Sequence, residues 1–250
     1  MHDLIYKHKN LILKIKRVLN YFSGIDIIGY PTLELQRRIK LMNHHSIDVI
    51  LDVGANIGDY AKDMRNIGFK GEIFSFEPVK EVFDILLRDA SKDKLWKVFN
   101  YAIWEKDGEA TINISKNLVS SSLLNSLPQL VSSAPRANFV LQEKIKIQKL
   151  DSIFDDLKLR DKKIYLKIDT QGYEEMVLLG ANKSLEFISG IQIEMPLIPS
   201  YVGSMTFDKM KQKLNMLGFR LVAVENGFYN KKTGEQIELD GIFYRDNLCN

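Results

Sequence analysis

The heptapeptide Asp52-Val53-Gly54-Ala55-Asn56-Ile57-Gly58 follows a short β-branched run, 48–53 (DVILDV), and precedes a helical pattern that begins at Asp59. The run predicts a buried strand that ends in a turn. Gly54 and Gly58 allow backbone angles that other residues avoid, and they let a ligand approach the main chain closely. The helix that follows offers unpaired N–H groups. The sequence therefore predicts a strand–turn–helix unit with a ligand crevice at the strand's carboxyl end, although the same glycines would also serve a turn that binds nothing.

Strand and helix patterns alternate along the rest of the chain. The predicted strands are 48–53, 72–76, 97–103, 163–169, 191–195, 219–225 and 238–245, and the predicted helices are 32–43, 59–66, 78–90, 173–185 and 207–217. This alternation predicts a parallel sheet covered on both faces, and the last two strands predict a closing antiparallel hairpin. The turn signal Asp107-Gly108 before the alternating run 110–114 predicts a further hairpin, and 115–135 is expected to be a long loop.

Length and composition fit one globular α/β domain with a short extension. The chain has 250 residues, of which 45% are hydrophobic and 27% charged, so it is neither disordered nor fibrous. We expect an N-terminal helical extension over 1–45 and the main domain over 46–250. The single cysteine, Cys249, leaves no disulfide and no cysteine cluster for zinc. With no apolar stretch of ~20 residues and no secretory signal, a cytoplasmic location is expected.

The N-terminal extension carries an unusual concentration of positive charge. The net charge of the chain is only +3, and basic and acidic residues are mostly interleaved, so no nucleic-acid partner is expected. Before residue 24, however, a single acid, Asp3, faces the five cations Lys7, Lys9, Lys14, Lys16 and Arg17. Apolar residues lie among them at helical spacing. Such a helix either lies on an anionic membrane surface, as a peripheral contact, or packs on the domain or on a second copy in a homo-oligomer.

Glu77 lies at the end of the next predicted strand. A carboxylate there can accept hydrogen bonds from both ribose hydroxyls of a nucleoside, and it can also cap the helix opened by Pro78. The dinucleotide fingerprint is G-x-G-x-x-G, but Asn56 occupies its middle glycine position and Asp52 precedes it. A pyrophosphate is disfavoured beside Asp52, whereas an ammonium and a sulfonium are favoured. Electrostatics thus favours S-adenosylmethionine over NAD, with an NAD-dependent oxidoreductase as an alternative.

The sequence resembles the FkbM family of S-adenosylmethionine-dependent methyltransferases over about 47–244. The matching stretches, in order, are 49–60 (VILDVGANIGDY), 73–78 (IFSFEP), 100–108 (NYAIWEKDG), 120–123 (SSSL), 150–153 (LDSI), 165–181 (YLKIDTQGYEEMVLLGA) and 191–201 (IQIEMPLIPSY). The resemblance implies a class I methyltransferase (Rossmann-like) fold, in which a seven-stranded, mostly parallel sheet contains one antiparallel strand. One departure is Gln171, where many members have Glu.

The resemblance also implies the cofactor site. Asp52, Gly54, Asn56 and Gly58 would hold the methionine part, Glu77 the ribose, and Asn100 and Ala102 the adenine, with Asp169 near the transferable methyl. Ala55, Tyr60 and Pro78 lie in the same motifs and complete the predicted set.

Methyl transfer to a hydroxyl needs alignment and a base that takes the proton. All four histidines precede the core motifs, so a carboxylate is the expected base. Asp169 is the first candidate and Glu194 and Glu174 are the next. Lys167 stands two residues before Asp169, so its side chain points to the same face and can pair with a carboxylate. Asp169 and Glu194 could also hold Mg²⁺, which the spacing does not require.

The acceptor is less readable than the cofactor site. The family implies a hydroxyl on a sugar, a glycan or a small natural product, and Ser120, Ser121, Ser122 and Tyr201 are candidates for lining its pocket. The predicted function is therefore an S-adenosylmethionine-dependent O-methyltransferase. A non-catalytic cofactor-binding or docking module is the alternative.

Overall fold

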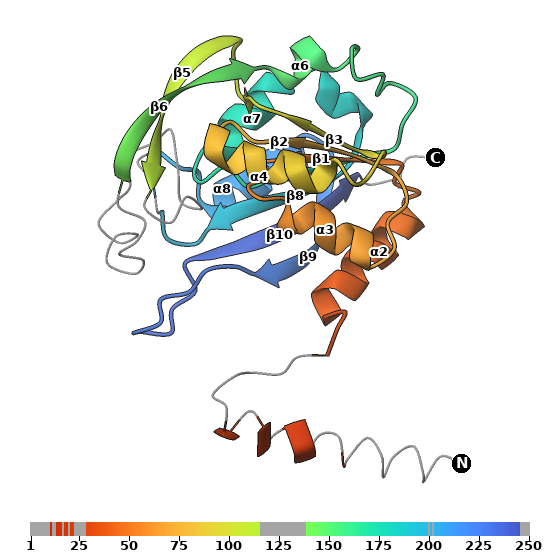
Figure 1. Ribbon diagram of the computed structural model, residues 1–250, viewed down its shortest axis with the longest axis vertical. Helices are drawn as coiled ribbons and strands as arrows, with labels where there is room; N and C mark the ends of the chain where they lie inside the picture. The colour runs from red at the N-terminus through yellow and green to blue at the C-terminus, as the bar shows by residue number, and fades with distance from the viewer. Residues whose placement is uncertain are drawn as a thin grey trace.

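A computed structural model describes residues 11, 14–16, 18–19, 21–22, 29–115, 139–199, 201 and 203–245. Its centre is a seven-stranded sheet with the strand order β3-β2-β1-β7-β8-β10-β9 (Figure 1). The strands are β1 Val49–Val53, β2 Glu72–Phe76, β3 Trp96–Phe99, β7 Ile164–Ile168, β8 Ile188–Pro196, β9 Phe219–Asn226 and β10 Glu238–Arg245. β10 pairs antiparallel with both β8 and β9, and the other pairs are parallel. The predicted class I methyltransferase fold, with its antiparallel C-terminal hairpin, is confirmed.

Helices cover both faces of the sheet, because successive side chains of a buried strand point to opposite sides. On one face Ile50 of β1 shares a core cluster with residues of α2 Leu33–His44, α3 Asp59–Asn66 and α4 Lys80–Ala90. On the other face Val49 and Leu51 share a cluster with residues of α6 Leu150–Ile153, α7 Glu174–Gly180 and α8 Phe207–Met216. Although α2 belongs to the predicted N-terminal extension, its Leu35 and Met42 are thus part of the core of the sheet.

A smaller sheet, with the strand order β4-β6-β5, corrects two sequence-based expectations. The predicted strand 97–103 is wrong beyond Phe99, since β4 Ala102–Ile103 pairs in parallel with β6 Phe139–Gln148 instead. The predicted hairpin near 110–114 is also wrong in its partner, because β5 Gly108–Ser115 pairs antiparallel with β6, a strand that was not predicted. Apolar residues of β5 and β6 pack on Val79 and Val82 at the start of α4. Residues 116–138, including most of the predicted loop, lie outside the described residues.

The remaining differences are local. The predicted helix 173–185 is divided into α7 and a 3₁₀ helix, Ser184–Phe187. The described residues between 11 and 22 are helical. In the described part of the chain, no helix is both long and apolar enough to cross a lipid bilayer.

Candidate active site

A row of polar side chains crosses the middle of the sheet. Ser75, Asp52, Lys167 and Gln192 are register partners on the neighbouring strands β2, β1, β7 and β8, and all four are buried. The Ser75 hydroxyl donates to Asp52 Oδ2 at 3.2 Å and accepts from the indole N–H of Trp96 at 2.9 Å. The order of the strands along the chain reverses at β1 and β7, so the row lies at the switch point where ligands bind in open α/β sheets.

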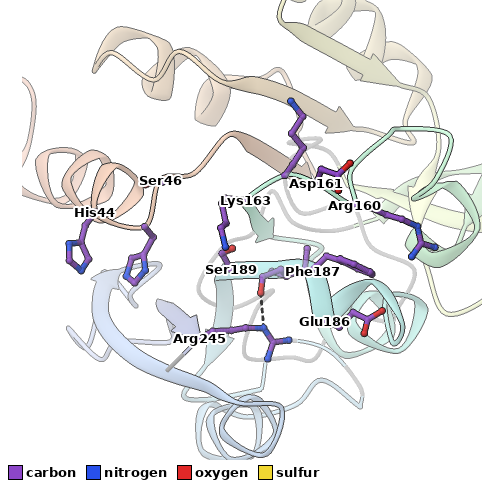
Figure 2. Close-up of a pocket in the computed structure, with 12 residues that line it drawn as sticks. His44, Ser46, Arg160, Asp161, Lys163, Glu186, Phe187, Ser189 and Arg245 are labelled. Atoms are coloured by element: carbon purple, nitrogen blue, oxygen red, sulfur yellow. Dashed lines mark hydrogen bonds between the residues drawn. The ribbon is translucent and has the colours of Figure 1, made fainter. Parts of the chain in front are cut away.

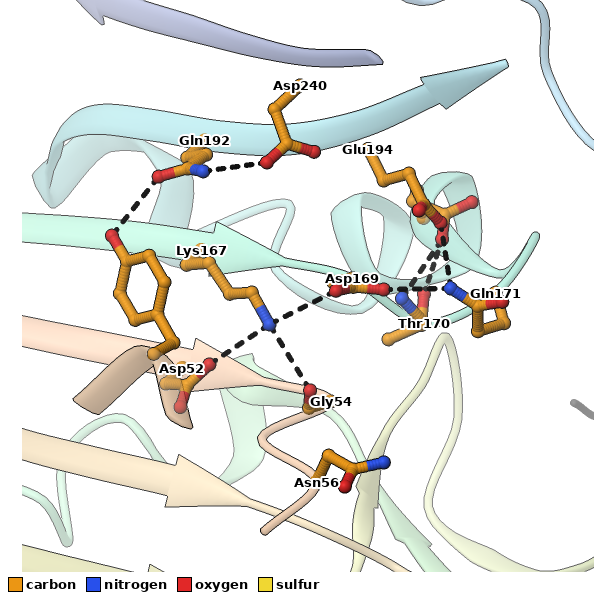
Figure 3. Close-up of polar contacts among 12 residues, drawn as sticks. Asp52, Gly54, Asn56, Lys167, Asp169, Thr170, Gln171, Gln192, Glu194 and Asp240 are labelled. Atoms are coloured by element: carbon orange, nitrogen blue, oxygen red, sulfur yellow. Dashed lines mark hydrogen bonds and ion pairs between the residues drawn. The ribbon is translucent and has the colours of Figure 1, made fainter. Parts of the chain in front are cut away.

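Lys167 is the cation at the centre of this row (Figure 3). Its Nζ lies 3.2 Å from Asp52 Oδ1 and 3.5 Å from Asp169 Oδ2, and it donates to the carbonyl oxygen of Gly54 at 3.2 Å. Burial alone would lower the pKa of Lys167, but Asp52 and Asp169 raise it above its ordinary value. Burial raises the pKa of Asp52, against the opposing effect of Lys167. The Lys167 side chain therefore stays charged, and it holds the Asp52 and Asp169 carboxylates and the Gly54 carbonyl together.

The loop after β1 crosses close to the end of β7. Gly54 has a φ of +76°, and a Cβ there would fall 1.8 Å from the carbonyl oxygen of Asp169, so only glycine fits. Asn56 has a φ of 49°, and its side-chain oxygen accepts from the N–H of Ile57 at 2.7 Å. This left-handed residue turns its own N–H toward Glu77, whose Oε2 accepts it at 3.0 Å.

Glu77 caps the start of α4, one of the two roles that its position predicts, and it also binds the loop after β1. Its Oε1 accepts from the N–H of Val79 at 2.9 Å at the start of α4, while Oε2 binds the loop at Asn56. Burial raises the pKa of Glu77 to about 7, although both N–H groups oppose the shift. Asn100 supports the same bend, because its side-chain amide donates to the carbonyl oxygens of Glu77 and Pro78. Each carboxylate oxygen accepts a single backbone N–H and keeps further capacity to accept hydrogen bonds.

A second polar cluster lies where β7 and β8 end (Figure 3). The side-chain amide of Gln171 donates to Asp169 Oδ1 and to Glu194 Oε2, both at 3.0 Å, and its oxygen accepts from the Tyr201 hydroxyl at 2.9 Å. Gln171 has a φ of 56°, a strained conformation for a residue with a side chain. The strained residue thus ties the two predicted base candidates together, a role that the sequence did not predict.

The carboxyl groups of this cluster differ in environment. Burial, followed by the charges of Asp169, Glu238 and Glu174, raises the pKa of Glu194 well above its ordinary value. Burial raises the pKa of Glu174 to about 7, even though its carboxylate accepts from the N–H groups of Thr170 and Gly172. Glu174 therefore shapes the turn after β7. The side chain of Asp169, in contrast, is 40% exposed.

Tyr60, a predicted cofactor-binding residue, is hydrogen-bonded inside the fold beside Lys167. The Tyr60 hydroxyl donates to Gln192 Oε1 at 3.1 Å, inside the fold, and the Gln192 amide donates in turn to Asp240 at 2.9 Å. Ala102 belongs to the small sheet and packs against the same apolar cluster as Ile57 of the loop after β1. Ser120, Ser121 and Ser122 lie outside the described residues. Gln192 and Asp240 were not predicted, since each stands in a strand run and neither follows a strand end.

No metal site accompanies the crevice in the described residues, where no group of three or more His, Cys, Asp or Glu side chains could hold an ion. Asp169 and Glu194, the predicted Mg²⁺ ligands, instead share the Gln171 amide. A cavity of about 720 Å³ lies at the opposite edge of the sheet, where β7 and β8 begin (Figure 2). Its Arg245 donates to the carbonyl oxygens of Ile188, Leu217 and Leu185, so this guanidinium is engaged in the fold.

Fold and crevice together are those of a class I methyltransferase. The FkbM methyltransferase domain family matches residues 52–221, and the chain belongs to this family. The match confirms both the predicted family and the predicted enzyme class, an S-adenosylmethionine-dependent methyltransferase. An NAD-dependent oxidoreductase is thereby set aside.

Solved structures that resemble the chain share little sequence with it. TehB from Haemophilus influenzae is 9% identical over 92% of this chain and 67% of its own, with a TM-score of 0.46. Magnesium protoporphyrin IX methyltransferase (ChlM) from Synechocystis PCC 6803, with bound S-adenosylmethionine, is 8% identical over 85% of this chain and 80% of its own, with a TM-score of 0.43. No match to a curated protein was found.

Proposed function

We propose that the chain transfers a methyl group from S-adenosylmethionine to a hydroxyl of a sugar, a glycan or a small natural product. The observation that carries the proposal is the position of Asp169 at the end of β7. Its carboxylate is partly exposed, and it is fixed by Lys167 on one oxygen and by Gln171 on the other. A fixed, accessible carboxylate is suited to accept the proton of a hydroxyl.

The residues of the crevice fit this cofactor. When bound, S-adenosylmethionine supplies a methyl group on a positively charged sulfur, and its ammonium adds a second positive charge. Asp52 and Asp169 outnumber the one cation between them, Lys167, so their charges favour a cationic ligand over a pyrophosphate. Glu77 keeps acceptor capacity on both oxygens for two ribose hydroxyls, and the loop from Gly54 to Gly58 would hold the methionine part.

Each residue then has a separate task. Asp169 would accept the acceptor's proton as its oxygen attacks the methyl carbon in line with the departing sulfur. Lys167 and Gln171 would hold the Asp169 carboxylate in place. Such alignment matters because well-oriented reacting groups avoid up to ~7–11 kcal/mol of the barrier. Tyr201, through the Gln171 oxygen, would fix the wall against which the acceptor lies.

The test is the Asp169→Asn variant, assayed with labelled S-adenosylmethionine against a panel of hydroxylated sugars and natural products. We expect turnover to fall by about 10²–10⁴-fold, the usual contribution of a general base, while calorimetry shows cofactor affinity within a few-fold of the parent. Unchanged turnover would remove Asp169 from the base role. Transfer only to amines would overturn the hydroxyl acceptor. Tight cofactor binding without turnover on any acceptor would favour the non-catalytic module.

A cytoplasmic location belongs to the same proposal. It is supported by the single cysteine of the chain, which is typical of proteins in a reducing compartment. Fractionation of the cells that make the protein, with marker enzymes for each compartment, tests it, and recovery with the secreted fraction would contradict it.

A further inference from the structure

The described residues between 11 and 22 are helical and expose an apolar face. Leu11, Ile15, Val18 and Phe22 are 55%, 50%, 54% and 81% exposed. At about 100° per residue of an α-helix, these four side chains fall within an arc of about 60°; we call them the apolar face. Figure 1 shows the described parts of this segment apart from the helices that cover the sheet. The domain therefore does not bury the face, and packing on the domain is set aside for these four residues.

Positive charge borders the apolar face. On the same helical projection, Lys14 lies about 70° from the centre of the face on one side, and Lys16 lies about 130° from it on the other. In the sequence up to residue 22, five cations stand against the single acid Asp3. Lysines on both flanks of an apolar stripe can extend their ammonium groups to lipid headgroups while their stems and the stripe enter the acyl boundary.

The positive charge of the segment also favours a lipid surface over a second copy of the chain as what covers the apolar face. Two copies joined through their apolar faces would bring the flanking lysines of both chains together, and each chain has only Asp3 as an acid before residue 24 to offset them. An anionic phospholipid surface offers the opposite charge on both flanks. Each lysine near such a surface strengthens binding by about fivefold, an effect that salt screens. We propose that the 11–22 segment lies on an anionic phospholipid surface and holds the methyltransferase domain there.

The experiment is sedimentation of the full chain with two kinds of vesicle, phosphatidylcholine alone and phosphatidylcholine mixed with phosphatidylglycerol. We expect binding to the mixed vesicles only, weakening as salt is added. The triple variant Leu11→Gln, Ile15→Gln, Phe22→Gln should bind more than about tenfold more weakly. Lys14→Gln with Lys16→Gln should lose about fivefold per lysine at low salt.

The matched control removes similar exposed apolar surface from the domain. Leu33→Gln, Met216→Gln and Leu141→Gln replace side chains that are 76%, 76% and 63% exposed, and they should leave vesicle binding unchanged. Analytical ultracentrifugation of the parent and of the Leu11 triple variant, without lipid, tests the alternative that a second copy of the chain covers the apolar face. The proposal would be overturned if the parent failed to bind mixed vesicles or bound both kinds of vesicle equally. It would also be overturned if the control set weakened binding as much as the Leu11 triple variant, or if the parent formed a dimer that this variant dissociates.

Discussion

Lys167 neutralises a carboxylate that has no access to water. Asp52 is fully buried, and the Lys167 side chain is only 10% exposed. In the variant Lys167→Met the side chain keeps most of its volume and loses its charge, so Asp52 loses this cation and keeps the hydrogen bond from the Ser75 hydroxyl. Breaking a buried pair on one side costs about 3–5 kcal/mol. We expect the free energy of unfolding in urea to fall by that amount.

A matched control is Lys97→Met. Lys97 pairs with Glu72 at 3.2 Å, but the two side chains are 53% and 31% exposed, and exposed pairs contribute about 0–1 kcal/mol. Equal losses in the two variants would mean that Lys167 is not the charge on which Asp52 depends. The double variant Lys167→Met with Asp52→Asn should recover part of the loss, because it removes the stranded charge.

We expect cofactor binding to depend on pH through Glu77. Its pKa in the free enzyme is about 7 because the carboxyl is buried, and ribose hydroxyls donate best to the ionised form. Binding should therefore tighten as the pH rises and level off above 7, with Kd about tenfold weaker at about pH 6 than at about pH 8. Calorimetry in buffers of different ionisation enthalpy should detect proton release near pH 6 and little near pH 8.

The sign for stability is opposite, since the folded state keeps the Glu77 proton to higher pH than the unfolded chain. This carboxyl therefore makes the free energy of unfolding fall as the pH rises from 4.5 towards about 7. Glu77→Gln should remove this contribution to the pH dependence of both cofactor binding and stability. A variant that released as many protons on binding as the parent would assign the titration to another group.

At the residue scale, the site residues that could be predicted from the sequence are those at strand ends. Asp52, Glu77 and Asp169 each follow or close a buried strand, and parallel strands bring their carboxyl ends to one edge. The contacts of Gln171 with Asp169, Glu194 and Tyr201 could not be predicted, because they and its left-handed backbone depend on how β7, β8 and the chain near Tyr201 meet. The binding and catalytic roles of Asp52, Glu77 and Asp169 stay predictions.

Among the elements, α2 is tied to the far edge of the sheet by one buried ion pair. Arg38 Nε donates to Glu225 Oε2 of β9 at 2.7 Å, and its guanidinium also lies over the Tyr60 ring at 5.3 Å. The two side chains are 15% and 2% exposed. Arg38→Met would leave Glu225 buried and unpaired, so we expect about 3–5 kcal/mol less stability in urea unfolding.

Arg37→Met is the control for this change. The Arg37 guanidinium donates to the carbonyl oxygen of Val224, at 3.3 Å, in an exposed position, so its loss should change stability by less than about 1 kcal/mol. If both arginine variants behaved alike, the attachment of α2 would rest on apolar packing through Leu35 and Met42 instead.

The bounds of elements with clear local signals were predicted well, whereas the pairing within the smaller sheet was not. α3, β2 and β10 have the predicted bounds, because turn residues and periodic apolar positions mark them locally. β6 was missed although Ile145 and Ile147 alternate with lysines in it. Its antiparallel partner, β5, precedes it by more than twenty residues of chain, and such non-local pairing leaves no signal in a short window.

For the whole molecule, one apolar cluster connects both halves of the large sheet. Phe243 of β10 is fully buried in the same cluster as Val49 of β1 and Leu166 of β7. Ile112 of β5 belongs to a separate cluster beneath the small sheet. If a contiguous core unfolds as one cooperative unit, damage in β10 should spread to β1, whereas damage in β5 should stay local.

Phe243→Ala tests this with native-state amide hydrogen exchange. Removing the buried ring costs about 3–5 kcal/mol, and because β1, β7 and β10 share one core, protection should fall by the same amount in all three strands. Ile112→Ala costs about 2–5 kcal/mol at its own site, but its effect should be confined to β5, β6 and the start of α4. Loss of protection in β8–β10 alone after Phe243→Ala would show that the C-terminal hairpin unfolds separately from the strands that carry Asp52 and Asp169.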